Sequence, residues 1–170
     1  MGKTLNQLAG WLEMNVTFTE SEFDFSENGE SFYIMEEGAD EAFAVCTVDA
    51  EDRLMHFEYL DPDEYGTSGS KPGDMPAVAE AFIREFHPDG LKTYRLQSVI
   101  DLDDPYLVGY GIQDERYGLD LPGIGFSLTI TAAGKVVQFS FDEGPADVRY
   151  PEHVISEEEA KEAYMERTDF

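Results

Sequence analysis

One cysteine and three histidines are the residues of this chain best suited to nucleophilic, acid–base or metal chemistry. Cys46 lies between apolar residues on the expected core face of a strand, where a thiol packs and is unreactive. His56 is expected to point outward from the next strand, without a serine or cysteine partner that the sequence identifies. His87 ends a predicted helix and His153 lies in a predicted loop. We therefore expect no catalytic residues, no metal ligands and no cofactor, and predict that the chain is not an enzyme.

Calcium is the metal that the acidic residues would suit best. Asp24, Ser26, Asn28 and Gly29 have the spacing of half a calcium loop, but Met35 occupies the twelfth place, where a carboxylate is required. A hairpin turn is the favoured interpretation of this segment. Two further acidic clusters comprise Asp61, Asp63 and Glu64, and Asp101, Asp103 and Asp104. With 37 acidic residues in the chain such clusters arise by chance, and we interpret them as solvated loops.

Five glycines lie between residues 109 and 125, which indicates tight turns or bulges. Gly109-x-Gly111 is not a dinucleotide loop, because the third glycine and the following helix of that motif are missing. The glycine-rich and acidic loops leave a small-ligand or calcium-binding role open as an alternative function of the chain.

The charge balance disfavours whole classes of partner. The net charge is −26, which repels phosphate backbones and anionic lipid, so nucleic-acid and membrane-surface binding are not expected. No apolar stretch approaches the ~18 residues of a membrane-spanning helix. Twelve phenylalanines and nine tyrosines supply enough apolar surface for a folded core. Since no signal-peptide core follows the first residues, we expect a cytoplasmic protein, the alternative being an extracellular fragment.

Hydrophobic periodicity predicts an α+β protein built from three helices and seven or eight antiparallel strands. The helices are expected at 4–13, 75–87 and 156–168, begun by Thr4, Asp74 and a capping box from Ser156 to Glu159. Strands are expected at residues 32–35, 43–48, 54–59, 91–100, 106–112, 124–130 and 136–141, and two-residue alternation also marks residues 16–19 and 23–25.

An offset of about 82 residues aligns the chain with itself. It carries Thr47 onto Thr129, Phe57 onto Phe139 and the cap Asp74 onto Ser156. We therefore expect two tandem helix-on-antiparallel-sheet units, 1–90 and 91–170, either separate or packed as one compact domain. Each unit is expected to end with its helix, which pairs 41–60 with 75–87 and 123–142 with 156–168. Ala160, Ala163 and Tyr164 should then pack on the second of two sheets.

The run from Ser127 to Phe139 has apolar alternation around an Ala-Ala-Gly turn, and the segment from His153 to Ala160 leads into the helix expected at 156–168. These segments resemble the PepSY-type propeptide domains and are similar to the YcdB/YcdC repeats of bacterial proteins. The first copy departs from the pattern in having Asp52 where the turn glycine is expected. The resemblance implies a helix packed on an antiparallel sheet and a binding or inhibitory role, with no catalytic residues.

The leading functional prediction is therefore a non-enzymatic protein-interaction or inhibitory module. A sheet face without a helix, or an edge strand, would accept a protein partner or a second copy of the chain.

Overall fold

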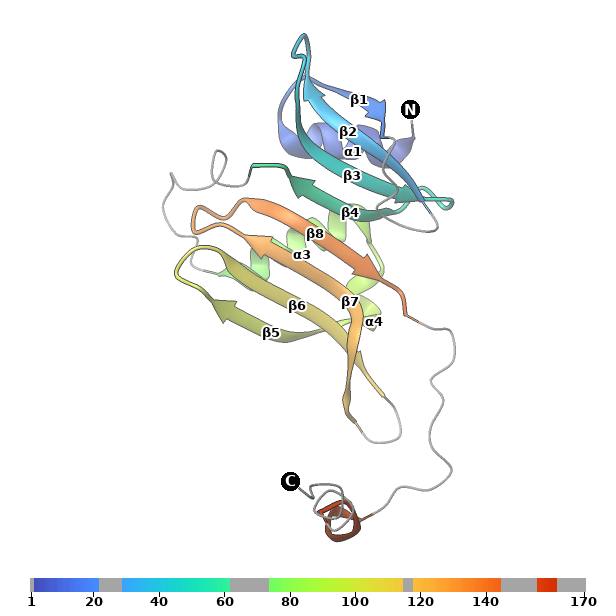
Figure 1. The fold of residues 1–170 in the computed structure, drawn as a ribbon, viewed down its shortest axis with the longest axis vertical. Helices are drawn as coiled ribbons and strands as arrows, with labels where there is room; N and C mark the ends of the chain where they lie inside the picture. Colours follow the sequence, from blue (N-terminus) through green and yellow to red (C-terminus); the bar gives the residue numbers. More distant parts are fainter. Residues whose placement is uncertain (1, 22–28, 62–73, 115–117, 145–155, 162–170) are drawn as a thin grey trace, which may run out of the picture.

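Eight antiparallel strands and three helices form the body of the protein in a computed structural model, which describes residues 2–21, 29–61, 74–114, 118–144 and 156–161 (Figure 1). The elements in chain order are α1 (Lys3–Leu12), β1 (Val16–Glu20), β2 (Gly29–Glu36), β3 (Ala42–Asp49), β4 (Leu54–Tyr59), α3 (Met75–Phe86), α4 (Gly90–Thr93), β5 (Arg95–Asp101), β6 (Tyr106–Gln113), β7 (Asp120–Ile130) and β8 (Val136–Asp142). Residues 157–161 add a short helical segment. The α+β class is confirmed.

The strands form one sheet in the order β1-β2-β3-β4-β8-β7-β6-β5. Two four-stranded meanders are joined along their last strands, because β4 pairs with β8 through Phe57 opposite Phe139. The prediction of two separate sheets was wrong. Period-two alternation had identified the buried faces of these strands, but it carries no information about which strand edges pair.

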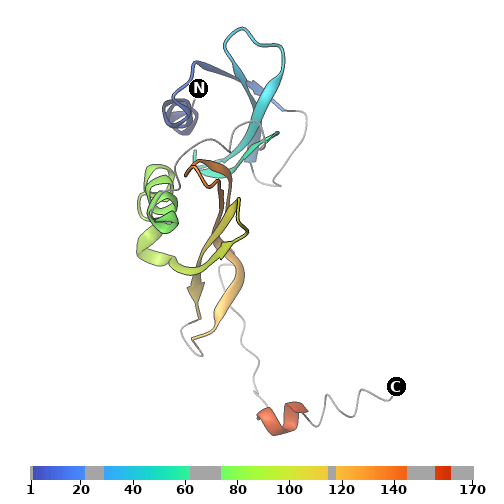
Figure 2. The same cartoon turned by 90° about the vertical axis from the view of Figure 1, so that its left-hand side faces the viewer.

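α1, α3 and α4 lie on one face of this sheet, and no helix of the described ranges covers the other (Figure 2). α3 contacts all of the strands that follow it, β5 to β8, and it also contacts α1. α3 therefore packs chiefly on the strands that follow it, which corrects the expectation that residues 75–87 pair with 41–60. The predicted packing of Ala160 on β8 was also wrong, because residues 156–161 are exposed. Ala163 and Tyr164 lie outside the described residues.

A cluster of aromatic rings under α3 holds the two meanders together. Phe82 of α3 is fully buried, and its ring centroid lies 5.1 Å from that of Phe139 and 6.4 Å from that of Phe57. One helical side chain thus packs on both strands at the centre of the sheet. Cys46 is fully buried in the same core, as predicted, and burial raises the pKa of its thiol to about 12.

Side-chain caps begin two helical segments as predicted. The Asp74 carboxylate accepts a hydrogen bond from the Ala77 backbone N–H at 3.1 Å, and the capping box of Ser156 and Glu159 is formed. The first helix differs from the prediction, since it begins at Lys3 and places Thr4 within its first turn. Residues 91–93 also differ, because they belong to α4 rather than to a strand.

Asp52 explains both the start of α1 and the missing turn glycine. It has a left-handed backbone conformation, with φ of 59°, in the turn between β3 and β4. Its carboxylate accepts hydrogen bonds from the backbone N–H of Lys3 at 2.8 Å and of Thr4 at 3.4 Å. The Thr4 hydroxyl donates in turn to the Asp52 carbonyl. An aspartate in this turn therefore caps a helix 48 residues away, which a glycine could not do.

Candidate functional site

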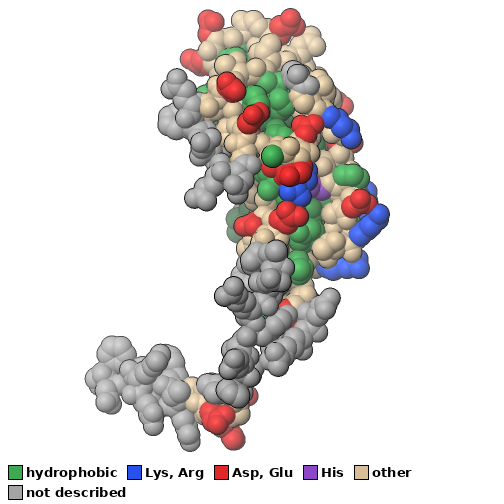
Figure 3. Space-filling model, turned by 90° about the vertical axis from the view of Figure 1, so that its right-hand side faces the viewer, with side chains coloured by type: hydrophobic (Ala, Val, Ile, Leu, Met, Phe, Trp, Pro, Cys, Tyr) green, Lys and Arg blue, Asp and Glu red, His purple; other side chains and the backbone are tan. Residues whose placement is uncertain are grey.

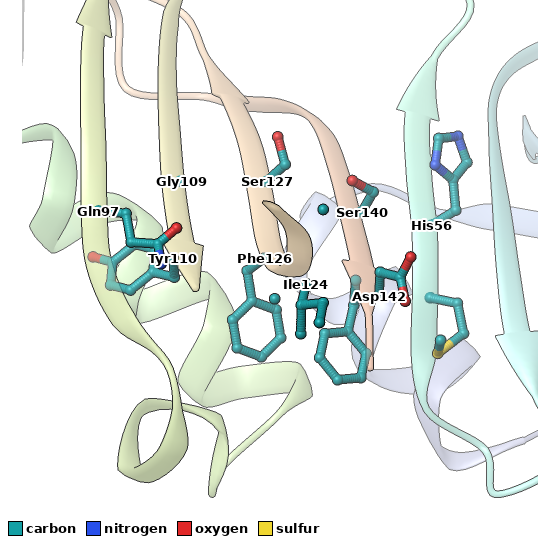
Figure 4. A pocket seen from close by; sticks show the side chains of 13 residues that line it. His56, Gln97, Gly109, Tyr110, Ile124, Phe126, Ser127, Ser140 and Asp142 are labelled. Carbon is teal, nitrogen blue, oxygen red and sulfur yellow. The ribbon is translucent and has the colours of Figure 1, made fainter. Parts of the chain in front are cut away.

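The face of the sheet without helices carries a row of small and polar residues across five strands. Cross-strand partners in an antiparallel sheet lie on the same face, so the pairing register defines this row. It runs from His56 on β4 through Ser140 and Ser127 to Gly109 (Figure 4), and the strand pairing continues it to Ser98 on β5. The side chains that these strands turn toward the helices are apolar, so the open face is the polar one.

A groove of about 710 Å³ lies on this open face. The glycine-rich segment supplies part of its lining through Gly109, Gly123 and Gly125. Gly125 has φ of +121°, and a Cβ at this position would lie 2.0 Å from the Tyr110 carbonyl oxygen. Only glycine fits there, so the narrow approach of β7 to β6 depends on it. The segment singled out from sequence thus forms a groove, although residues 115–117 lie outside the described part.

His56 lies at the margin of the groove and points outward, as predicted. Its Nε2 atom lies 3.3 Å from a carboxylate oxygen of Glu58, and Ser140 is its direct cross-strand neighbour. Sequence reasoning missed Ser140, because only the pairing of β4 with β8 brings the two together. The site is an open sheet surface on which His56, Glu58 and Ser140 are the polar neighbours of the central strand pair.

His87 is a structural residue. The ring is buried, and Nε2–H donates to the Leu54 carbonyl at 2.7 Å. Phe126, Phe139 and Phe141 surround the ring at centroid distances of 4.6–5.7 Å. Burial lowers the pKa of His87, so the neutral form is favoured despite its position at the end of α3. His153 lies outside the described residues.

The carboxylates of the acidic cluster at the end of β5 accept backbone hydrogen bonds. Asp104 accepts a hydrogen bond from the Ala132 N–H at 2.9 Å, and Asp101 accepts one from the Asp103 N–H at 2.9 Å. Across the described ranges, no group of three or more histidine, cysteine, aspartate or glutamate residues is placed to hold a metal ion. Asp61 is exposed. The remaining calcium candidates, Asp24, Ser26, Asn28, Asp63 and Glu64, lie outside the described residues.

The outer strand β5 is the most exposed apolar element that the structure describes. It forms one edge of the sheet, and all seven of its residues are exposed. Leu96, Val99 and Ile100 are 46%, 45% and 48% exposed, and Leu102, just beyond the strand, is 53% exposed. At the other edge β1 has five residues, and its apolar residues Val16 and Phe18 are half-buried. The two edges of the sheet are therefore unequal.

The two ends of β5 carry opposite charge. Arg95 is its first residue, whereas Lys92 lies before it in α4 and is paired with Asp89; Asp101 is its last residue, and Asp103 follows. Within the described residues no carboxylate forms an ion pair with Arg95. Basic groups are scarce on this protein, and Figure 3 shows acidic side chains spread over one side of the molecule with few basic ones among them. A strand with one basic end is thus unusual on this surface.

Comparison with known proteins identifies the fold. No family model matches the chain, and no curated protein is similar to it in sequence. The structure resembles the Bacillus megaterium YpeB C-terminal domain with a TM-score of 0.62 and 13% sequence identity, over 94% of this chain and 71% of that one. The two proteins therefore share a fold. Among the described helices, none has the length and apolar character needed to cross a bilayer.

Proposed function

We propose that this chain is a non-enzymatic protein-interaction module of PepSY-like type, which binds an extended strand of a protein along β5. One observation carries the proposal: a whole edge strand is exposed, with three aliphatic side chains about half accessible to solvent. The resemblance to the YpeB C-terminal domain supports the PepSY-like part of the proposal at the level of the fold.

Strand addition suits the chemistry of this edge. The outer side of an edge strand presents backbone N–H and C=O groups that an added strand can pair. Proteins usually protect such edges with charge, proline, short length or a bulge. β5 has a register shift between Leu96 and Ser98, but the segment from Ser98 to Asp101 is regularly paired with β6 and bears no charge before Asp101. This segment can therefore pair on its outer side.

A selection of short displayed peptides against the full chain at nanomolar concentration tests the proposal. We expect the selected peptides to carry apolar residues at alternate positions and to bind the Val99→Lys variant at least about tenfold more weakly. Leu60→Lys is the matched control, because Leu60 is a 52% exposed aliphatic residue that follows β4, away from β5. Peptides that bind Val99→Lys as tightly as the wild type would contradict the proposal.

The groove on the open face supports a second candidate function, binding of a small ligand. Its volume of about 710 Å³ is in the range of small-molecule sites, and its lining combines glycine backbone with His56 and Asp142. A thermal-shift screen of small polar compounds tests this function, with Ser127→Leu as the variant that fills the groove. A compound that raises the melting temperature of the wild type but not of Ser127→Leu would support it, and equal shifts would contradict it.

A further inference from the structure

The edge strand β5 has features that favour one particular partner, and this inference rests on the proposed role of β5 in strand pairing. The exposed aliphatic residues lie in the middle of the strand and opposite charges lie at its ends. In an antiparallel pair of identical strands, the start of each strand lies beside the end of the other. Arg95 of each copy would then lie beside the acidic end of the other.

We propose that the strand taken up by β5 is β5 of a second copy of this chain, related by a twofold axis at Val99. From Ser98 onward β5 pairs regularly with β6, so its faces alternate without interruption. An axis at Val99 sets Val99 against Val99 of the second copy, and Ser98 against Ile100 of the second copy. Both pairs keep their side chains on matching faces, as antiparallel pairing requires. The result is a continuous sheet through two molecules.

The unequal edges of the sheet explain why this dimer would close. Pairing of β5 with β1 of another copy would be head-to-tail and would continue into an open filament. Pairing of β5 with itself uses the same edge on both copies and ends after two. The short β1, with half-buried apolar residues, offers no comparable surface.

Charge complementarity favours a second copy over other protein segments. The chain carries a net charge of −26, so most encounters between two copies are repulsive. With the axis at Val99, Arg95 lies opposite position 103 of the second copy, beside its acidic end, and symmetry repeats this contact. With the axis at Val99, residues 97–101 of the two strands overlap, and this five-residue pair buries less than about 1,000 Å² in total, so we expect a dissociation constant in the micromolar range.

Sedimentation equilibrium of the full chain across the micromolar range tests this inference. We expect the mass to rise with concentration from 19.1 kDa to twice that value. Val99→Lys should remain monomeric, and Leu60→Lys should dimerise as the wild type does. Arg95→Glu should weaken dimerisation about tenfold, and Arg95→Lys, which keeps the positive charge, should change it little. Circular-dichroism melts confirm that each variant is folded.

The outcomes separate this inference from the proposed function. A chain that stays monomeric throughout, while displayed peptides still bind along β5, would overturn the second copy as partner and leave strand pairing in place. A dimer that is unaffected by Val99→Lys would also overturn the inference, because the interface would then lie elsewhere. A monomer that selects no peptides sensitive to Val99→Lys would overturn both.

Discussion

Replacement of Asp52 probes the link between the β3–β4 turn and helix α1. This residue combines a left-handed backbone with a carboxylate that caps a helix distant in sequence. Three substitutions separate the two roles. Asp52→Asn keeps an acceptor oxygen and tolerates the left-handed conformation, Asp52→Gly keeps only the conformation, and Asp52→Ala keeps neither.

The expected magnitudes follow from these roles. Loss of a helix cap costs about 1 kcal/mol, and loss of a carboxylate at a helix N-terminus adds about 0.3–1 kcal/mol. Glycine recovers about 1 kcal/mol by relieving the left-handed strain, whereas alanine retains that strain. We therefore expect Asp52→Gly and Asp52→Asn to lower the free energy of unfolding by at most about 1 kcal/mol. Asp52→Ala should lower it by about 1.3–2 kcal/mol, the sum of the cap and charge contributions.

Urea unfolding of the four proteins, monitored by circular dichroism, measures these differences. Gly2→Ala provides a further check, because a Cβ at Gly2 would lie 2.4 Å from a carboxylate oxygen of Asp52. It should destabilise the wild type and have less effect in the Asp52→Gly background. The reasoning is refuted if Asp52→Ala unfolds at the same urea concentration as the wild type, or if the Gly2→Ala effect is the same in both backgrounds.

Three further predictions concern solution conditions. Burial lowers the pKa of His87 from 6.5, so the contribution of its neutral ring to stability is complete above pH 6.5 and is lost as the pH falls toward the folded-state pKa. The difference in unfolding free energy between wild type and His87→Gln should therefore shrink on acidification. A difference that stays constant with pH would contradict this. Added sodium chloride should raise the melting temperature, because salt screens the self-repulsion of a chain with net charge −26, whereas an unchanged melting temperature would argue against this effect. Millimolar calcium should leave the melting temperature unchanged, because Asp104 and Asp101 already accept backbone hydrogen bonds, and a clear rise would restore the calcium-binding alternative.

Local patterns predicted those parts of the fold that depend on neighbouring residues. Asp74 and the Ser156–Glu159 box cap helices as expected, because a cap involves residues only three positions apart. Cys46 is buried as expected, because strand alternation fixes the face of each residue. These features need no knowledge of the tertiary arrangement.

Features that depend on tertiary pairing were not predictable from these patterns. The pairing of Phe57 with Phe139 joins the two meanders into one sheet. The alternation of apolar residues is equally compatible with two separate sheets, so it could not predict this pairing. Asp52 caps a helix 48 residues away, and Ser140 meets His56 only through that central strand pair. The strand order also places β5 at an edge of the sheet. The sequence alone therefore does not distinguish its exposed side chains from those of an inner strand.

Backbone hydrogen–deuterium exchange most directly tests whether β5 pairs with a strand. Exchange is followed in the full chain, first dilute and then with a saturating selected peptide or at high protein concentration. We predict that residues 95–101 become slower to exchange on pairing, because the outer N–H groups of β5 gain acceptors, while residues 16–20 of β1 do not change. Exchange in 95–101 that is equally fast in both states, with protection elsewhere or nowhere, would contradict the assignment of β5 as the binding strand.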